Sequence, residues 1–184
     1  MAAPAPNGPR DAGAVRYLLW VHFQHIDLGP QPHNAALVAG LWAMKPNHAD
    51  TRAFVVGSPL QDSACRYGSS FSRAVEIARG DLRHLTISGT ASIDRSGATV
   101  HVGDVAAQLN LTMRVVEAIL HSRGMVWADV TRALAYFRRP SDVAAYRRWE
   151  AVNGTGPLPV IIGAHTVCRA NLLYEVEVDA LTCR

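Results

Sequence analysis

Apolar and polar residues alternate near the end of the chain and predict a strand with two unlike faces. Tyr174, Val176 and Val178 alternate with Glu175 and Glu177, and a period of two is typical of a half-buried strand. One face is then apolar and the other carries two carboxylates. Two interpretations of the acidic face stay open. It meets water or an interface, as exposed carboxylates commonly do, or it holds a proton donor in a cleft.

A helix is predicted over residues 105–123. Asp104 is a good N-cap and Gly124 is a stop signal. Between them apolar side chains, among them Leu109 and Val116, recur on one face of the helix.

A second helix is expected to begin with Ser141 as its cap and to end at Gly154. Ala145, Trp149 and Val152 follow the i, i+4, i+7 spacing of a buried helical face.

Short apolar runs between turn signals predict the strands. The candidate strands are residues 15–23, 52–56, 131–137, 160–167 and 172–181, a hairpin of residues 71–78 and 81–92 around Arg79-Gly80, and residues 35–44, which are either strand or short helix. Together with the helices they predict an α+β fold, a mixed sheet with two helices on one face.

The sheet face away from the helices carries Leu173, Glu175 and Glu177, which is too polar for a core and too apolar for bare water. Packing the sheets of several subunits together would cover this face and place acidic groups at subunit clefts.

One domain with two N-terminal additions is expected from 184 residues. Residues 1–13 are rich in Ala, Pro and Gly but lack the charged start and apolar core of a signal peptide, which predicts a disordered leader. Residues 14–65 would add strands to a core domain formed by residues 66–184.

Composition narrows the class of partner. The formal net charge is +3, and the 18 Lys and Arg residues are spread without a long run, which favours a small anionic ligand over nucleic acid.

No apolar run reaches the length of about 18 residues that a membrane span needs. Cys65, Cys168 and Cys183 are an odd number without metal-binding spacing, so we expect a reducing, cytoplasmic compartment, no metal and no cofactor.

Several segments resemble a known family in their order and residues. They are residues 85–94, the turn at Arg95-Ser96-Gly97 and the helix opening at Asp104, together with Ser88-Gly89 and Glu175-Val176-Glu177. Over residues 67–181 the chain resembles the Rid family (RidA/YjgF), small α+β proteins that assemble as trimers with active sites between subunits. The resemblance implies a Rid/chorismate-mutase-like sheet, extra N-terminal strands and a homotrimer.

Within that superfamily the chain is most similar to the catalytic half of the chorismatases, which hydrolyse chorismate and release pyruvate. The matching residues are Tyr67-Gly68, Phe71-Ser72-Arg73-Ala74, Ser88-Gly89-Thr90-Ala91-Ser92, Val102-Gly103-Asp104-Val105-Ala106-Ala107-Gln108, Cys168-Arg169, Leu172-Leu173 and Glu175-Val176-Glu177. Much of the N-terminal half of chorismatases has no counterpart here.

The resemblance places Glu175 where chorismatases keep the glutamate that protonates the enolpyruvyl methylene, with Glu177 beside it to orient or tune it. A carboxyl group in a half-dry cleft next to a second one is expected to have a raised pKa and to hold its proton near neutrality. The alternative is that both glutamates only line a trimer core.

The resemblance also assigns the rest of the site. Cys168 stands where the chorismatase subtype that makes 3-hydroxybenzoate carries cysteine. Three roles are open for it: a nucleophile, a part of the pocket wall, or an inert buried thiol. Arg73 and Arg169 are expected to hold carboxylate bidentately, unless they are surface arginines. Tyr67 is expected to donate a hydrogen bond to the substrate, and Ser88-Gly89 to be a point of close backbone approach.

Two departures from the family patterns bear on the substrate. Rid deaminases grip the substrate carboxylate with an arginine early in the penultimate strand, where this chain has Val160, and this disfavours imine deamination. The Pro-Arg that follows Tyr67-Gly68 in chorismatases is replaced by Ser69-Ser70, so one carboxylate-binding arginine is missing. Arg66 is the candidate to substitute for it.

The sequence therefore predicts a chorismatase-like lyase or hydrolase of specialised metabolism that acts on chorismate or a related enol-containing acid. Alternatives are a tailoring enzyme that uses the same glutamate for dehydration or cyclisation, an enamine or imine deaminase, and a non-catalytic ligand-binding protein. Two arginines facing Glu175 would favour chorismate, whereas an apolar pocket with one polar end would favour the tailoring enzyme. A filled cleft would favour the non-catalytic protein.

Overall fold

The computed structural model describes residues 18–24, 38–44 and 46–184, the first two ranges by their backbone alone. The leader expected over residues 1–13 lies outside the described residues. The described strands are β1 (Leu18–Gln24), β2 (Val38–Met44), β3 (Arg52–Val56), β4 (Ala74–Arg79), β5 (Leu82–Ala91), β6 (Val130–Phe137), β7 (Val160–Ala164) and β8 (Tyr174–Cys183). The described α-helices are α1 (Val105–Ser122) and α2 (Val143–Asn153).

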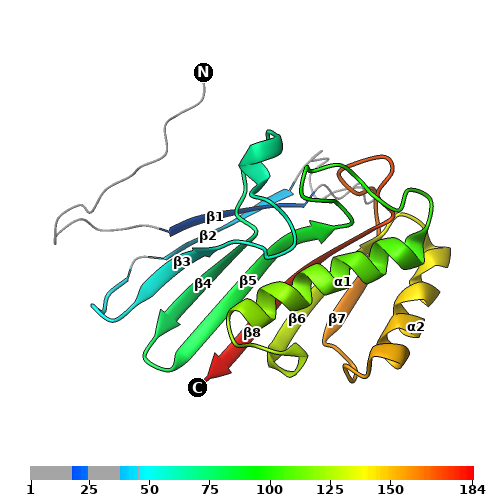
Figure 1. The fold of residues 1–184 in the computed structure, drawn as a ribbon. Helices are drawn as coiled ribbons and strands as arrows, with labels where there is room; N and C mark the ends of the chain where they lie inside the picture. Colours follow the sequence, from blue (N-terminus) through cyan, green and yellow to red (C-terminus); the bar gives the residue numbers. More distant parts are fainter. Residues whose placement is uncertain (1–17, 25–37, 45) are drawn as a thin grey trace.

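Six strands form one mixed sheet in the order β3-β4-β5-β8-β6-β7. Neighbours pair antiparallel except β6 and β7, which are parallel. Both helices lie on one face of this sheet (Figure 1). The predicted α+β fold is confirmed. β3 extends the sheet as expected, whereas β1 and β2 pair with each other in a separate two-stranded sheet.

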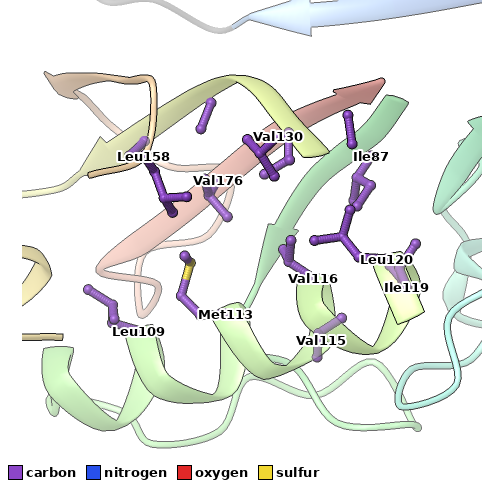
Figure 2. Packing of buried hydrophobic residues seen from close by; sticks show 14 of the residues in the cluster. Ile87, Leu109, Met113, Val115, Val116, Ile119, Leu120, Val130, Leu158 and Val176 are labelled. Atoms are coloured by element: carbon purple, nitrogen blue, oxygen red, sulfur yellow. The ribbon is translucent and has the colours of Figure 1, made fainter. Parts of the chain in front are cut away.

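Helix α1 supplies much of the core. Figure 2 shows Leu109, Met113 and Val116 pointing from α1 toward the sheet, where Val176 of β8 lies among the buried side chains. Each of these three helical side chains is at most 2% exposed. Burying a side chain of this size stabilises the fold by about 1.5–3 kcal/mol. The carboxylate of Asp104 accepts a hydrogen bond from the Ala107 backbone N–H, so the predicted N-cap is confirmed.

The prediction for α2 was wrong in two respects: the residue at its N-cap, and one of the residues on its buried face. Ser141 lies inside a 3-10 turn, Pro140–Asp142, and the residue at the N-cap is Asp142. Proline sets a helical φ at the first position of this turn, so Ser141 lacks the extended backbone that a capping side chain needs. Val152 is 83% exposed, because the face that packs on the sheet carries Ala145, Tyr146 and Trp149 instead.

Strand β8 has the two faces that its alternation predicts. Tyr174, Val176 and Val178 are at most 2% exposed and pack against the helices. Glu175 and Glu177 therefore lie on the opposite face of the sheet. Among the described residues, no helix is both long enough and apolar enough to cross a membrane.

Candidate active site

A cleft of about 360 Å³ opens on the sheet face opposite the helices. Strand β8 contributes Glu175 and Glu177 to it, and β5 contributes Ser88 and Gly89. Small-molecule sites typically have volumes of about 300–1,000 Å³, so the cleft has room for one small ligand.

The floor of the cleft forms where β5 leaves regular pairing. The register between β5 and β8 shifts between Ile87 and Thr90. Ser88, inside this irregularity, is fixed by its own hydrogen bonds: its N–H donates to the Arg73 carbonyl at 3.0 Å and its hydroxyl donates to the Ser72 carbonyl at 2.7 Å. Ser88 is therefore a structural part of the floor, with its hydroxyl already engaged.

Gly89 makes space for the Glu175 side chain. A Cβ atom at Gly89 would collide with Oε1 of Glu175 and crowd its Cδ. The carboxyl group thus lies directly over the β5 backbone, which accounts physically for a glycine at this point of close approach. Glu175 is half-buried, whereas Glu177 is only 6% exposed.

The Cys168 thiol faces the Glu175 carboxyl group. Cys168 is exposed as a residue, so it is not the inert buried thiol that the sequence left open. Partial burial of its sulfur atom, followed by the charge of Glu175, nevertheless raises the pKa of Cys168 to about 11, and the thiol also hydrogen-bonds with Glu175. A thiol with this pKa stays protonated near neutrality. A cysteine nucleophile reacts as its thiolate, so the geometry favours Cys168 as a hydrogen-bonding wall residue over Cys168 as a nucleophile.

Tyr67 forms the far wall between two arginines. The guanidinium carbons of Arg73 and Arg169 lie 5.5 and 5.7 Å from the centre of its ring. Gly97 packs against the ring so closely that a Cβ there would overlap it. Burial raises the pKa of Tyr67 even though both arginines lower it, so the phenol keeps its proton.

Two residues that the sequence did not single out hold the loop that carries Cys168 and Arg169. Gln108 of α1 is fully buried, and its side chain donates to the Asn171 carbonyl at 2.9 Å and accepts from the Leu173 N–H at 2.8 Å. Arg138 donates to the carbonyls of Arg169 and Leu172 at 2.9 and 3.0 Å. In the sequence, Gln108 ends one of the segments that match the chorismatases and lies on the apolar face of the predicted helix, whereas no signal marked Arg138.

Eight of the nine predicted site residues line this cleft: Tyr67, Arg73, Ser88, Gly89, Cys168, Arg169, Glu175 and Glu177. Arg66 does not line it. Its side chain is 75% exposed and pairs with Asp62 at 3.0 Å, so in this structure it does not replace the missing arginine.

The apolar part of the lining was not predicted. Phe71, Ala91, Ile93 and Leu172 surround the polar groups. They come from a loop, the end of β5 and the segments that follow β5 and precede β8. Phe71, Ala91 and Leu172 stand in segments that match the chorismatases, but no role in the site was predicted for them.

Comparisons with known proteins agree with this fold. The sequence is 31% identical over 126 residues to a chorismatase of Streptomyces rapamycinicus, covering 61% of this chain and 37% of the chorismatase. A crystal structure of a chorismatase superposes with a TM-score of 0.66 at 26% identity, over 77% of this chain and 46% of that chain. A Mycobacterium tuberculosis member of the YjgF/YER057c/UK114 family superposes with a TM-score of 0.53 at 25% identity, over 70% and 98%. No family profile matches the sequence.

The six-stranded mixed sheet with two helices on one face has the Rid architecture. The comparisons support a relation to the Rid superfamily, close to the chorismatases. The chain spans less than half the length of the chorismatases that it matches.

Proposed function

We propose that this protein is a chorismatase-like enzyme that acts on an enol-containing carboxylic acid, with Glu175 as the general acid. The observation that carries the proposal is the position of the Glu175 carboxyl group, over Gly89 in an open cleft and beside the Cys168 thiol. The similarity to chorismatase supports a lyase or hydrolase chemistry.

The proposed step is protonation of the methylene carbon of an enol ether. The O–H of Glu175 gives its proton to that carbon, and the adjacent carbon becomes an oxocarbenium centre. Water adds to this centre and returns a proton to Glu175. The resulting hemiketal then breaks into pyruvate and an alcohol.

Cys168 assists Glu175 once the proton has left it. The protonated thiol donates to the carboxylate, and a hydrogen bond to an ionised acceptor is stronger than one to a neutral acceptor. Glu177, buried on the same strand face, orients the substrate in this scheme.

The direct test is pyruvate release. The purified chain is incubated with chorismate and, in parallel, with 2-phenoxyacrylate, a simpler enol ether that would give phenol and pyruvate. Pyruvate is measured with lactate dehydrogenase. Release from at least one substrate supports the proposal, and release from neither contradicts it.

Glu175→Gln is expected to reduce turnover by about 10²-fold or more, because the amide keeps the shape but supplies no proton. Glu117→Gln is the matched control. Glu117 lies outside the cleft and accepts from Trp127 Nε1 at 3.0 Å, and an amide oxygen retains this bond. Normal turnover by Glu175→Gln would show that another group donates the proton.

A tailoring enzyme is the second candidate, and the apolar lining of Phe71, Ile93 and Leu172 favours it. It would use Glu175 for dehydration or cyclisation, with no pyruvate released. A deaminase is less well supported, because Val160 packs against the core at the start of β7 and does not line the cleft.

A further inference from the structure

A groove of about 180 Å³ lies between α1 and α2, on the helical side of the sheet and away from the cleft (Figure 1). One water molecule takes about 30 Å³ of the liquid, so the groove has the volume of about six waters and suits a compact organic molecule. The residues that line it are Ala106, Leu109, Asn110, Ala145, Arg148, Trp149, Val152 and Asn153.

The floor of the groove is apolar and belongs to the core. Leu109 and Trp149 are 1% and 8% exposed, and the Trp149 ring packs edge-on against Trp127 with their centres 5.6 Å apart. The hollow arises between two alanines, Ala106 of α1 and Ala145 of α2, because the side chains at a helix contact set how closely the helices fill the space between them. The groove is therefore already formed in the folded chain.

Arg148 brings a positive charge to the mouth of the groove. It is exposed, and it forms no hydrogen bond or ion pair with any other residue that the structure describes. The nearby carboxylates are engaged elsewhere: Asp142 pairs with Arg139 at 2.8 Å, and Glu150 pairs with Arg147 at 3.2 Å. Within the described part of the chain, the charge of Arg148 thus stands without a partner above an apolar floor.

Asn110 supplies a second donor from the opposite helix. Its side-chain amide has two N–H donors, and it makes no hydrogen bond within the described ranges. At the rim, Val152 adds apolar surface that is 83% exposed. An apolar floor with a cation and an amide at the mouth matches a ligand that has an apolar body and one anionic end.

The groove is built by one chain. Its lining comes from α1 and α2 alone, whereas copies of the chain are expected to meet through the opposite face of the sheet, which carries Glu175 and Glu177. The groove therefore does not depend on the assembly for its charges or its shape.

We propose that this groove is a second binding site, for a small carboxylic acid with a compact apolar body. The apolar body fills the hollow against Leu109 and Trp149, and Arg148 and Asn110 hold the carboxylate at the mouth. The proposal goes beyond the proposed function and does not rest on it, because none of these residues lines the cleft.

Nuclear magnetic resonance of the ¹⁵N-labelled full chain tests the site with two probes, benzoate and benzamide, which share a ring and a similar shape but differ in charge. Benzoate is expected to shift the backbone amide signals of Asn110, Arg148 and Trp149. Its dissociation constant should be at least about tenfold lower than that of benzamide. Equal affinity for the two probes, no shifts at these amides, or shifts confined to the cleft around Gly89 would overturn the proposal.

Arg148→Gln removes the charge and keeps a polar side chain. It is expected to weaken benzoate binding about tenfold while leaving benzamide binding unchanged. Arg114→Gln is the matched control, because Arg114 is exposed on α1 outside the lining and the change in net charge is the same. Wild-type affinity for benzoate in Arg148→Gln, or an equal loss in the control, would show that Arg148 does not hold the carboxylate.

Ala106→Leu fills the hollow from an exposed position, and leucine is nearly as good a helix former as alanine. It is expected to remove binding of both probes at the groove, whereas Ala144→Leu, exposed on α2 outside the lining, should bind them as wild type does. Thermal melting shows whether each variant is folded, and the surface change Arg148→Gln gives an independent answer if Ala106→Leu is not. Wild-type binding by folded Ala106→Leu would overturn the site.

Discussion

At the residue scale, the cleft depends on the close approach between Gly89 and the Glu175 carboxyl group. The missing Cβ of Gly89 is the space that this carboxyl group occupies. The backbone of Gly89 does not have a positive φ, so the glycine is required by the neighbouring side chain and not by a turn.

Gly89→Ala is therefore expected to reduce turnover by about 10- to 100-fold while the chain stays folded. The new Cβ would push the end of a flexible side chain aside, and a displacement of about 1 Å in a reacting group can cost on the order of 10²-fold. Gly57→Ala is the control, because a Cβ at Gly57 meets nothing within 4 Å. Kinetics and thermal melting of both variants check this. Equal turnover by the two would show that Glu175 can work from another position.

Cys168→Ala is expected to change the rate or the product ratio without unfolding the chain. The change removes the hydrogen bond to Glu175, and because Cys168 is exposed it leaves no cavity in the core. Product analysis beside a thermal melt is the measurement. An unchanged rate and product profile would place Cys168 as packing only, and a collapsed melt would make its role structural.

At the element scale, a buried carboxylate joins α1 to the hairpin of β4 and β5. Glu76 of β4 is 1% exposed and accepts hydrogen bonds from Arg83 of β5 and from Arg123, the residue that caps α1. Burial alone would raise the pKa of Glu76, but the hydrogen bonds from Arg123 and Arg83 outweigh it and lower the pKa to about 2. The ordered hairpin carries Ser88 and Gly89 into the cleft.

Glu76→Gln is expected to lower the free energy of unfolding at pH 7 by about 3 kcal/mol, the equivalent of a pKa that falls from 4.5 to about 2. Because the pKa is lower in the folded state, this stabilisation is complete above about pH 4.5 and is lost as the pH falls toward 2. Urea unfolding between pH 7 and pH 2 measures the free energy of unfolding, and in the variant this free energy should lack the fall at acid pH that wild type shows. Exposed Asp50→Asn is the control, and equal pH profiles for wild type and Glu76→Gln would refute the role.

At the scale of the whole molecule, the sheet face around the cleft is half apolar and open. By strand alternation Val55, Ile161 and Leu181 lie on this face, and they are 71%, 68% and 41% exposed. Apolar side chains this exposed around an acidic centre are typical of a surface that a partner covers. We therefore expect copies of this chain to pack these faces together, and the resemblance to the Rid family implies three of them, with the clefts between subunits.

Light scattering on the purified chain is expected to give about three times the chain mass of 19.9 kDa. Ile161→Glu should dissociate the assembly, because it places a charge in the buried contact. Arg147→Glu, on the exposed side of α2, is the control and should leave the mass unchanged. A monomer in the wild-type chain would contradict sites between subunits.

Local patterns determined most of the elements of this protein. The alternation from Tyr174 to Val178 predicted a strand over residues 172–181 with two unlike faces, and β8 has both faces over Tyr174–Cys183, since a strand turns successive side chains to opposite sides whatever it packs against. The cap at Asp104 and the apolar period determined α1 in the same way. At α2, Pro140 overrode the capping signal of Ser141, and packing selected Tyr146 over Val152 for the buried face.

The tertiary structure decided which hydrogen-bond donors of the site residues are already engaged within the protein. The sequence suggested Arg73 and Arg169 as equivalent carboxylate binders and Arg66 as a substitute. The fold engages Arg73 with Tyr67, turns Arg66 to Asp62 and, among the residues that the structure describes, bonds Arg169 through Nη1 to Gly97 and Thr99. These differences depend on hydrogen bonds to groups up to 72 residues away. Residue identity and spacing set which chemistry is present, whereas only the packed chain sets which donors remain free for a ligand.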